Sequence, residues 1–393
     1  GSQKSWEDLG AWNASLFPVD NVPEDVRNKI ATLTEGCKDE VDKIRKVLEY
    51  LRDNTRYVSI QLGIGGYAPS SPESVSKTGY GDCKSLSYFM RTLLKGIGIE
   101  SYYVTLSTRD RDFPEGYSAM GQMNHAMLCV PVGKDTVWVE CTNPSLPLGY
   151  RHSGIAGHQV LLVKEDGQSK MVRVPDYADS LKYSYEQTEI TLDSDGSLKA
   201  SCLCSFRLDD AESFADIRKW EAKTQLARLT RGFRGSVGDF RLRSVSDNFD
   251  AWDGESDYVP QIDIRFDLTS NMYSKVMGDR LFVPVPVFSR GLTVSRSERV
   301  HEMCVTGTST IIDKIIVHVP EGYEIEALPK VNDISTRFFD IISTVEDGGD
   351  VITITVKATT KAGRFPKETY EEYRAVARNL NRIYESNLVF IKK

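Results

Sequence analysis

Residues 77–99 read K-T-G-Y-G-D-C-K-S-L-S-Y-F-M-R-T-L-L-K-G-I-G-I, and this stretch predicts a buried helix that begins with a cysteine. Asp82 is the predicted N-cap, which places Cys83 in the first helical turn. Apolar side chains recur at spacings of three and four residues, at Leu86, Phe89, Met90, Leu93, Leu94 and Ile97. Gly96 and Gly98 predict the end of the helix. The rest of the chain is organised around this element.

The position of Cys83 indicates a reactive thiol. The first turn of a helix favours a negative charge, because its N–H groups have no partners within the helix. A thiol placed there ionises more readily and becomes a better nucleophile. Most cysteines at such positions are packing residues, so Cys83 alone does not indicate catalysis.

Two later segments supply an imidazole and a carboxylate. Residues 124–130 (N-H-A-M-L-C-V) and 137–142 (V-W-V-E-C-T) predict a β-hairpin. A turn centred on residues 132–133 would place His125 directly opposite Glu140 on a polar working face, with an apolar core face behind it. Other turns are compatible with the same sequence, so the register stays open.

Thiol, imidazole and carboxylate are the groups that nucleophilic acyl transfer needs. Cys83 would attack a carbonyl, His125 would take its proton and later protonate the leaving group, and Glu140 would orient the imidazole. Taken singly, each has an ordinary alternative as a packing cysteine, a hairpin histidine or a surface carboxylate. Together, in this order along the chain, they favour catalysis.

An oxyanion hole is less clearly marked. The backbone N–H of Cys83 is one natural donor. Gln61 and Tyr57 are candidate side-chain donors, because they lie in or beside the Gly-rich segment that precedes the predicted helix. Both are equally explained as surface residues.

Composition and charge exclude several classes of protein. The chain has 393 residues, with 49 Lys and Arg against 56 Asp and Glu, so its net charge of −7 gives no general attraction to nucleic acid or anionic membranes. Seven cysteines without a C-x-x-C pair, and histidines without ligand spacing, predict no metal site, no cofactor and no disulfide framework. The sequence contains no 18-residue apolar run, so no integral membrane segment is predicted.

The order of elements predicts two domains. Helices, the cysteine helix and then antiparallel strands indicate an α+β core over residues 5–170. Residues 175–393 predict a β-rich domain with two helices, at 210–233 and 366–387, and a hairpin turn at 193–196. The sequence does not indicate a function for this second domain.

The motifs together resemble the transglutaminase-like superfamily. Residues 56–109, with the later N-H-A and W-V-E-C-T segments, are most similar to its bacterial branch, in which a G-D-C-K motif carries the nucleophile. The resemblance covers about residues 5–165 and implies a papain/transglutaminase-like fold. By this resemblance, Cys83, His125 and Glu140 match the Cys-His-Asp triad.

The resemblance also implies a location and a wider architecture. The branch is usually exported and usually has β-rich domains before and after the core. A periplasmic or otherwise exported location is therefore expected, although Gly1-Ser2-Gln3 has no signal-peptide character and looks like a tag remnant.

Three residues depart from the pattern of the branch. Glu140 replaces the usual aspartate and is one methylene longer, so the strand spacing must accommodate it. Cys141 stands where proline is frequent, and Ser85 stands where an aspartate often follows the motif lysine. These departures leave open a degenerate, catalytically weak site.

The predicted function is cysteine-dependent acyl transfer through a thioester at Cys83, with hydrolysis by a peptidase or amidase favoured. One alternative is a protein cross-linking transglutaminase. Another is a non-catalytic exported binding or scaffold protein that retains the fold. The predicted partner is a peptide or protein amide substrate, and the sequence does not indicate an oligomeric state.

Overall fold

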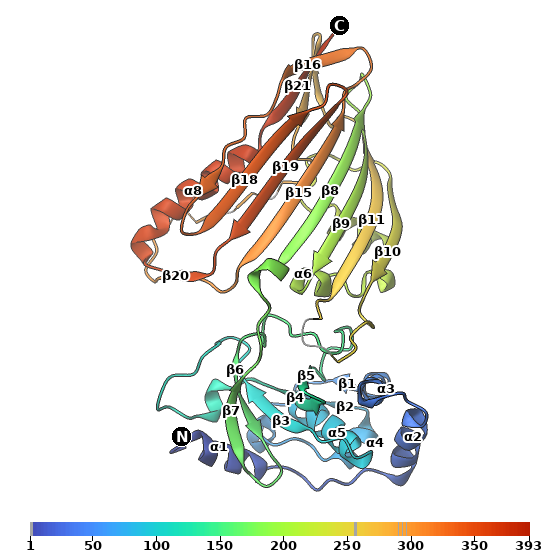
Figure 1. Cartoon of the computed structure of the whole chain (residues 1–393), viewed down its shortest axis with the longest axis vertical. Helices are drawn as coiled ribbons and strands as arrows, with labels where there is room; N and C mark the ends of the chain where they lie inside the picture. The colour runs from blue at the N-terminus through green and yellow to red at the C-terminus, as the bar shows by residue number, and fades with distance from the viewer. Residues whose placement is uncertain (1–2, 255–257, 290, 293, 296) are drawn as a thin grey trace. The chain divides into compact units, whose positions relative to one another are not determined.

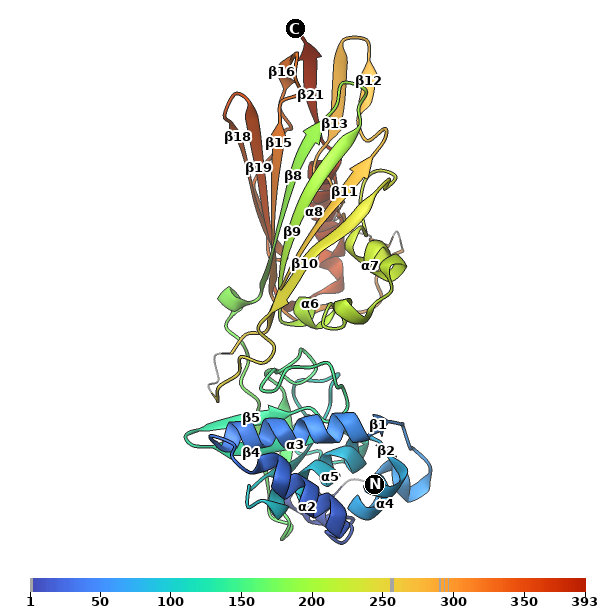
Figure 2. The same cartoon turned by 90° about the vertical axis from the view of Figure 1, so that its right-hand side faces the viewer.

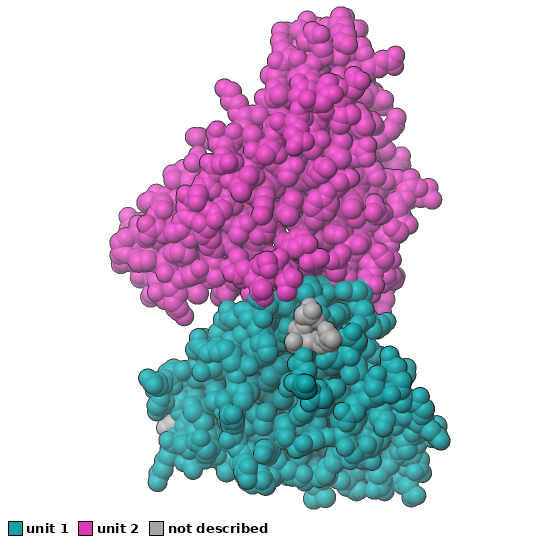
Figure 3. Space-filling view, in the orientation of Figure 1, with its two compact units in different colours: residues 1–177, 248–260 teal, residues 178–247, 261–393 magenta. Residues whose placement is uncertain are grey.

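The structure is a computed structural model that describes residues 3–254, 258–289, 291–292, 294–295 and 297–393 (Figure 1). The chain divides into two compact units, coloured separately in Figure 3. Unit 1 comprises residues 1–177 and 248–260, and unit 2 comprises residues 178–247 and 261–393. The predicted domains were continuous in sequence, whereas the segment 248–260 belongs to unit 1 although unit 2 surrounds it in the chain.

Unit 1 is built from helices packed on an antiparallel sheet, which confirms the predicted α+β class. Its helices are α1 (Trp6–Ala14), α2 (Glu24–Thr34), α3 (Glu40–Asn54), α4 (Pro72–Thr78) and α5 (Cys83–Gly96), with 3-10 turns η1 (Gly63–Gly66) and η2 (Met120–Gln122). Its strands are β1 (Arg56–Tyr57), β2 (Tyr80–Gly81), β3 (Tyr102–Leu106), β4 (His125–Val132), β5 (Asp135–Val139), β6 (Gln159–Val163) and β7 (Ser169–Arg173). The sheet order is β5-β4-β3-β6-β7, and β1 and β2 form a separate parallel pair.

Helix α5 lies at the centre of unit 1 (Figure 2). Every residue from Cys83 to Leu94 is buried, so the helix is covered on all sides and not only along its apolar stripe. Helices α2, α3 and α4 pack against it, as do strands β3 and β4 of the sheet. The helix ends at Gly96, and Gly98 adopts a φ of +78°, where a side chain would be strained. This burial fixes where the first residue of α5 sits.

The β4–β5 hairpin has a different register from the predicted one. Leu128 pairs with Val139 and Val132 with Asp135, so the turn is centred on residues 133–134 and the ladder stops before reaching His125. The predicted opposition of His125 and Glu140 within the ladder is therefore wrong. The shift moves each partner by two residues, which preserves the division of side chains between the two faces.

The predicted polar face of this hairpin is also wrong. Met127 and Trp138 lie on the same face as His125 and are buried in a second core with Val104, Leu106 and Val160. Both faces of the sheet are therefore packed. The polar side chains of the predicted site therefore lie at the strand ends. His125 is the first residue of β4, and Glu140 directly follows the last residue of β5.

Unit 2 is dominated by a long sheet with the strand order β10-β11-β9-β8-β15-β19-β18-β17. Its strands are β8 (Tyr183–Leu192), β9 (Leu198–Arg207), β10 (Phe240–Asp247), β11 (Gln261–Ser270), β15 (Ser309–His318), β17 (Ile334–Ser335), β18 (Phe339–Asp347) and β19 (Val351–Thr360). A smaller sheet is ordered β12 (Lys275–Met277), β13 (Arg280–Pro284), β21 (Asn387–Lys392) and β16 (Tyr323–Ala327). Strands β14 (Met303–Val305) and β20 (Gly363–Phe365) pair with each other. These strands confirm a β-rich C-terminal part.

The helices of unit 2 are shorter than the sequence predicted. Residues 210–233 do not form one helix but α6 (Asp209–Glu212), the 3-10 turn η4 (Ile217–Lys219) and α7 (Ala222–Leu229). The break comes where Trp220 and Glu221 adopt extended backbone, with ψ near 144° and 149°. Residues 366–387 contain η5 (Lys367–Thr369) and α8 (Tyr370–Tyr384), and a further turn, η3 (Asp179–Leu181), precedes β8. Burial alternates along β8 and β11, so one face of these strands is more deeply buried than the other.

Candidate active site

Cys83 is the first residue of α5, as predicted, and only 4% of it is exposed. The Asp82 side chain caps the helix by accepting hydrogen bonds from the Ser85 backbone N–H at 3.0 Å and from its hydroxyl at 2.9 Å. The cap leaves the thiol at the end of the helix where the macrodipole favours an anion.

The lysine that follows Cys83 has a structural role. The Lys84 ammonium bonds the Asp82 carboxylate, and their side chains are only 6% and 1% exposed. An unpaired buried carboxylate would be costly, so the lysine is the counter-ion that keeps the cap charged. Ser85, one of the departures from the family pattern, donates its hydroxyl to the same cap.

His125 and Glu140 meet although the ladder does not pair them. His125 Nε2 lies 2.7 Å from Glu140 Oε2, and the side chains are 14% and 6% exposed. The Cys83 thiol is close enough to His125 to contribute to the pKa of the imidazole. Because the carboxylate occupies Nε2, Nδ1 is the ring nitrogen left for the thiol. The structure thus brings the three predicted residues together in one array.

The carboxylate of Glu140 is held on both oxygens. Oε1 accepts hydrogen bonds from the Thr142 backbone N–H at 2.7 Å and from its hydroxyl at 2.6 Å. These bonds fold the longer side chain back toward its own backbone, so the additional methylene is accommodated beyond the end of β5 rather than by strand spacing. Burial raises the pKa of Glu140, but the hydrogen bond and charge of His125, with bonds from His152 and Thr142, hold it well below its usual range.

The surroundings of the imidazole favour its charged form. Burial opposes the charge on His125, but interactions with Cys83 and the hydrogen bond and negative charge of Glu140 raise its pKa to about 10. An imidazolium between a carboxylate and a thiolate is the arrangement that activates cysteine nucleophiles. Burial raises the pKa of Cys129 and that of Cys202 to about 12.

His152 is a neighbour of the array that the sequence did not indicate. Its Nε2 lies 3.5 Å from Glu140 Oε2, and its Nδ1 accepts a hydrogen bond from the Gly154 backbone N–H at 3.2 Å. The bond from Gly154 places the ring proton on Nε2, facing the carboxylate. The sequence indicated no role for His152, because it has no ligand spacing with other histidines and no spacing rule links it to Glu140.

The two oxyanion candidates differ in their placement. Tyr57 belongs to β1 and pairs with Gly81, two residues before Cys83, and it is 46% exposed. Gln61 is exposed in the segment between β1 and η1. Their roles in an oxyanion hole stay predictions.

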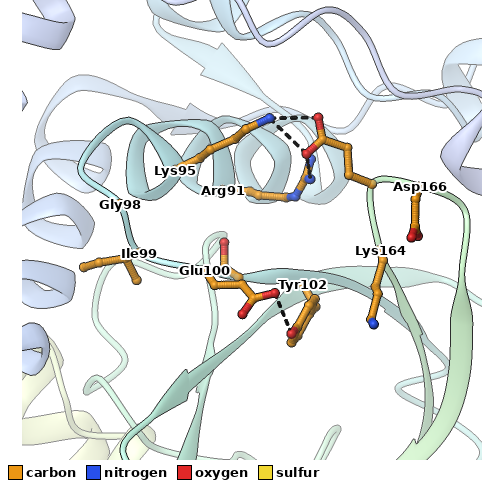
Figure 4. A pocket seen from close by; sticks show the side chains of 10 residues that line it. Arg91, Lys95, Gly98, Ile99, Glu100, Tyr102, Lys164 and Asp166 are labelled. Atoms are coloured by element: carbon orange, nitrogen blue, oxygen red, sulfur yellow. Dashed lines mark hydrogen bonds and ion pairs between the residues drawn. The ribbon is translucent and has the colours of Figure 1, made fainter.

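A polar pocket of about 450 Å³ lies at the other end of α5 (Figure 4). Lys95 contacts Glu165 and Asp20 at 2.8 Å, and Arg91 contacts Glu165 at 3.2 Å. At 1.5 Å per residue, Arg91 and Lys95 lie about 12 and 18 Å along the helix from Cys83. Three cationic and three acidic side chains line the pocket, so its charges are balanced, and no cysteine lines it.

Within the described ranges, no group of three or more His, Cys, Asp or Glu side chains is arranged to hold a metal ion. None of the helices in the described part of the chain has the length and apolar character needed to cross a bilayer.

The comparison with protein families agrees with the motifs. Residues 27–143 match the model of the Transglutaminase-like superfamily, and this range contains Cys83, His125 and Glu140. The match confirms the resemblance to this superfamily for residues 27–143, which lie in unit 1. Residues 279–390 match DUF3858, a domain of unknown function with a solved structure.

The comparisons with individual proteins are more distant. No curated protein matches the chain. A crystal structure described as a "putative protease" from Parabacteroides distasonis matches with a TM-score of 0.59 and 11% identity. The match covers 99% of this chain and 59% of that chain, so this chain spans about three fifths of its neighbour. At such low identity, the likeness shows a shared fold.

Proposed function

We propose that unit 1 is a cysteine-dependent acyl-transfer enzyme that hydrolyses a peptide or amide bond through a thioester at Cys83. The observation that carries the proposal is that His125 lies 2.7 Å from Glu140 and close enough to Cys83, the first residue of α5, for the thiol to affect the pKa of the imidazole. A match to the transglutaminase-like superfamily over the same residues supports it.

The array suits both halves of the reaction. The Cys83 thiolate attacks the amide carbonyl and forms a tetrahedral intermediate, and the His125 imidazolium then protonates the departing amine as the C–N bond breaks. This leaves a thioester and a neutral imidazole. Neutral His125 next removes a proton from water, which attacks the thioester and releases the acid and the thiol. Glu140 keeps the imidazole oriented and stabilises its charged form.

The proposal is tested by turnover on a library of peptides and glutamine amides, with and without added amines. Wild type should release acid products, and rapid quenching should reveal an acyl adduct on Cys83 by mass spectrometry. Cys83→Ala should lose at least about 10³-fold in rate. Cys304→Ala, which removes an exposed thiol in unit 2, serves as the matched control.

The outcomes separate the predicted alternatives. Amide exchange that outpaces hydrolysis at millimolar amine would identify a cross-linking transglutaminase instead. Equal, negligible turnover by wild type and Cys83→Ala, with no adduct, would leave a scaffold that retains the fold.

A further inference from the structure

The segment of residues 57–70 in unit 1 is hydrogen-bonded at its two ends to residues that flank Cys83 in the sequence. At its start, Tyr57 pairs with Gly81, and the Val58 backbone N–H donates to the Gly81 carbonyl at 2.9 Å. At its end, the Ser70 backbone N–H donates to the Ser85 hydroxyl at 2.9 Å. Gly81 and Ser85 lie two residues before and two residues after Cys83, so residues 58–69 pass beside the head of α5.

This segment exposes apolar side chains. Leu62 is 87% exposed, Ile64 62% and Tyr67 41%, and η1 has no buried residue. Among the described residues, six of the fifteen exposed large apolar side chains come from this segment and its partner β2: Tyr57, Val58, Leu62, Ile64, Tyr67 and Tyr80. Such a concentration of exposed apolar side chains on a protein surface is typical of a place where a ligand or partner binds.

The segment also lacks charge. Residues 57–71 (Y-V-S-I-Q-L-G-I-G-G-Y-A-P-S-S) contain no Asp, Glu, Lys or Arg, in a chain that is 27% charged. A charged group pressed against this surface would lose its hydration and find no counter-ion. The chemistry therefore favours an uncharged apolar group beside Cys83.

Another pocket of unit 1 is different in character. It has a volume of about 360 Å³ and is lined mainly by charged and polar side chains, which include Arg109, Asp110, Asp112 and Asn124. Unlike this pocket, the segment beside the head of α5 offers apolar side chains without charge.

We infer that residues 57–67 form the binding wall for an apolar side chain of the substrate, next to the carbonyl that Cys83 attacks. The occupant is an aliphatic or aromatic residue of a peptide, which would cover Leu62 and Ile64 as the carbonyl reaches the thiol. The inference rests on the proposed function, because continuity with Cys83 is what identifies the occupant as substrate.

The test measures kcat/KM for matched peptides that carry Leu, Gly or Asp beside the scissile bond. Wild type should prefer Leu over Gly by about 10–100-fold, the range that apolar contacts supply in enzyme specificity. In the double variant Leu62→Ser/Ile64→Ser, this ratio should fall at least tenfold. Both side chains are exposed, so the substitutions remove binding surface without opening a core.

Val19→Ser is the matched control, because Val19 is an 82% exposed apolar residue of unit 1 outside the segment. It should leave the Leu-to-Gly ratio at its wild-type value. A ratio near one in wild type, or a wild-type ratio in the double variant, would overturn the inference while leaving the acyl-transfer proposal standing.

Two other results also count against it. If wild type cleaves no peptide and forms no adduct at Cys83, the proposed function fails and the inference fails with it. If the double variant instead converts a dimer to a monomer in sedimentation and keeps its specificity, the surface joins two copies of the chain and does not bind substrate.

Discussion

Charged groups lie at both ends of helix α5, the head near Cys83 and the foot near Lys95, and the two ends differ in how exposed these groups are to water. At the head, Asp82, Lys84 and Glu140 have side chains that are at most 6% exposed. At the foot, Lys95 and Glu165 are 50% and 56% exposed, and only Arg91 is buried. The same helix therefore holds one charge network in a low-dielectric interior and another at the surface.

This difference predicts different consequences for similar substitutions. In the interior, each interaction is strong, and removing one partner leaves an uncompensated buried charge. At the surface, water and salt screen the pairs, so each contributes little. We therefore expect large effects on catalysis at the head and small effects on stability at the foot.

The largest expected effect is that of Glu140→Gln. The amide keeps the shape but removes the charge that stabilises imidazolium at His125, so kcat should fall by about 10²–10⁴-fold. Steady-state kinetics on the best substrate of the library would measure the loss. Glu165→Gln, the same substitution at the foot, should change kcat by less than about twofold. Equal effects of the two substitutions would remove the distinction between head and foot.

The same variant should shift the pH profile. Burial disfavours charge on His125, yet its interactions with Cys83 and Glu140 raise its pKa to about 10. Imidazolium is the form that protonates the leaving group, so wild-type activity should persist to about pH 10 and fall above it. Without the carboxylate, less interaction offsets the effect of burial, which lowers the pKa of His125. The alkaline limb of the Glu140→Gln profile should therefore move toward the ordinary histidine pKa near 6.5. An alkaline limb that does not move would contradict the coupling.

A smaller effect is expected at His152, which acts through Glu140. His152→Ala removes the second imidazole beside the carboxylate, and kcat should fall by about 5–20-fold with little change in KM. His152→Gln retains a donor of similar reach and should recover most of the rate. If His152 only supported the fold, the two variants would lose kcat equally. Equal losses would therefore contradict the role of His152 in positioning Glu140.

The smallest effect is expected at Lys95. Lys95 is 50% exposed and pairs with Glu165, which is 56% exposed, and with Asp20, which is 18% exposed, so Lys95→Met should lower the free energy of unfolding by at most about 1 kcal/mol. Urea denaturation at low and high salt would show the difference shrinking with ionic strength. A loss of several kcal/mol would show that the foot is as well shielded from water as the head.

Much of the core could be predicted, because local signals agreed with one another. The stripe from Leu86 to Leu94, the Asp82 cap and the terminal glycines all indicated α5, and the structure begins the helix at Cys83. The turn at Asp193–Gly196 joins β8 and β9, where Leu192 pairs with Leu198. Such signals depend on residues that are close in sequence, so the sequence alone could predict these elements.

Features that depend on packing between residues far apart in the sequence could not be predicted. The hairpin register was wrong because several turns near Gly133 satisfy the same alternation, and only the packed sheet selects one. Thr142 and His152 reach Glu140 from outside any ladder, so no periodicity could place them. The return of residues 248–260 to unit 1 involves Trp252, whose carbonyl accepts a hydrogen bond from Arg45. The exported location stays a prediction.

The most direct test of the account is the rate at which iodoacetamide alkylates each cysteine at pH 6.5, followed by mass spectrometry. Cys83 is buried and Cys304 is exposed, so exposure alone would favour Cys304. We predict that Cys83 reacts at least about tenfold faster than Cys304, and that His125→Ala abolishes this advantage. If Cys304 reacts faster in wild type, or if Cys83 reacts equally fast without His125, the array at the head of α5 does not activate its thiol.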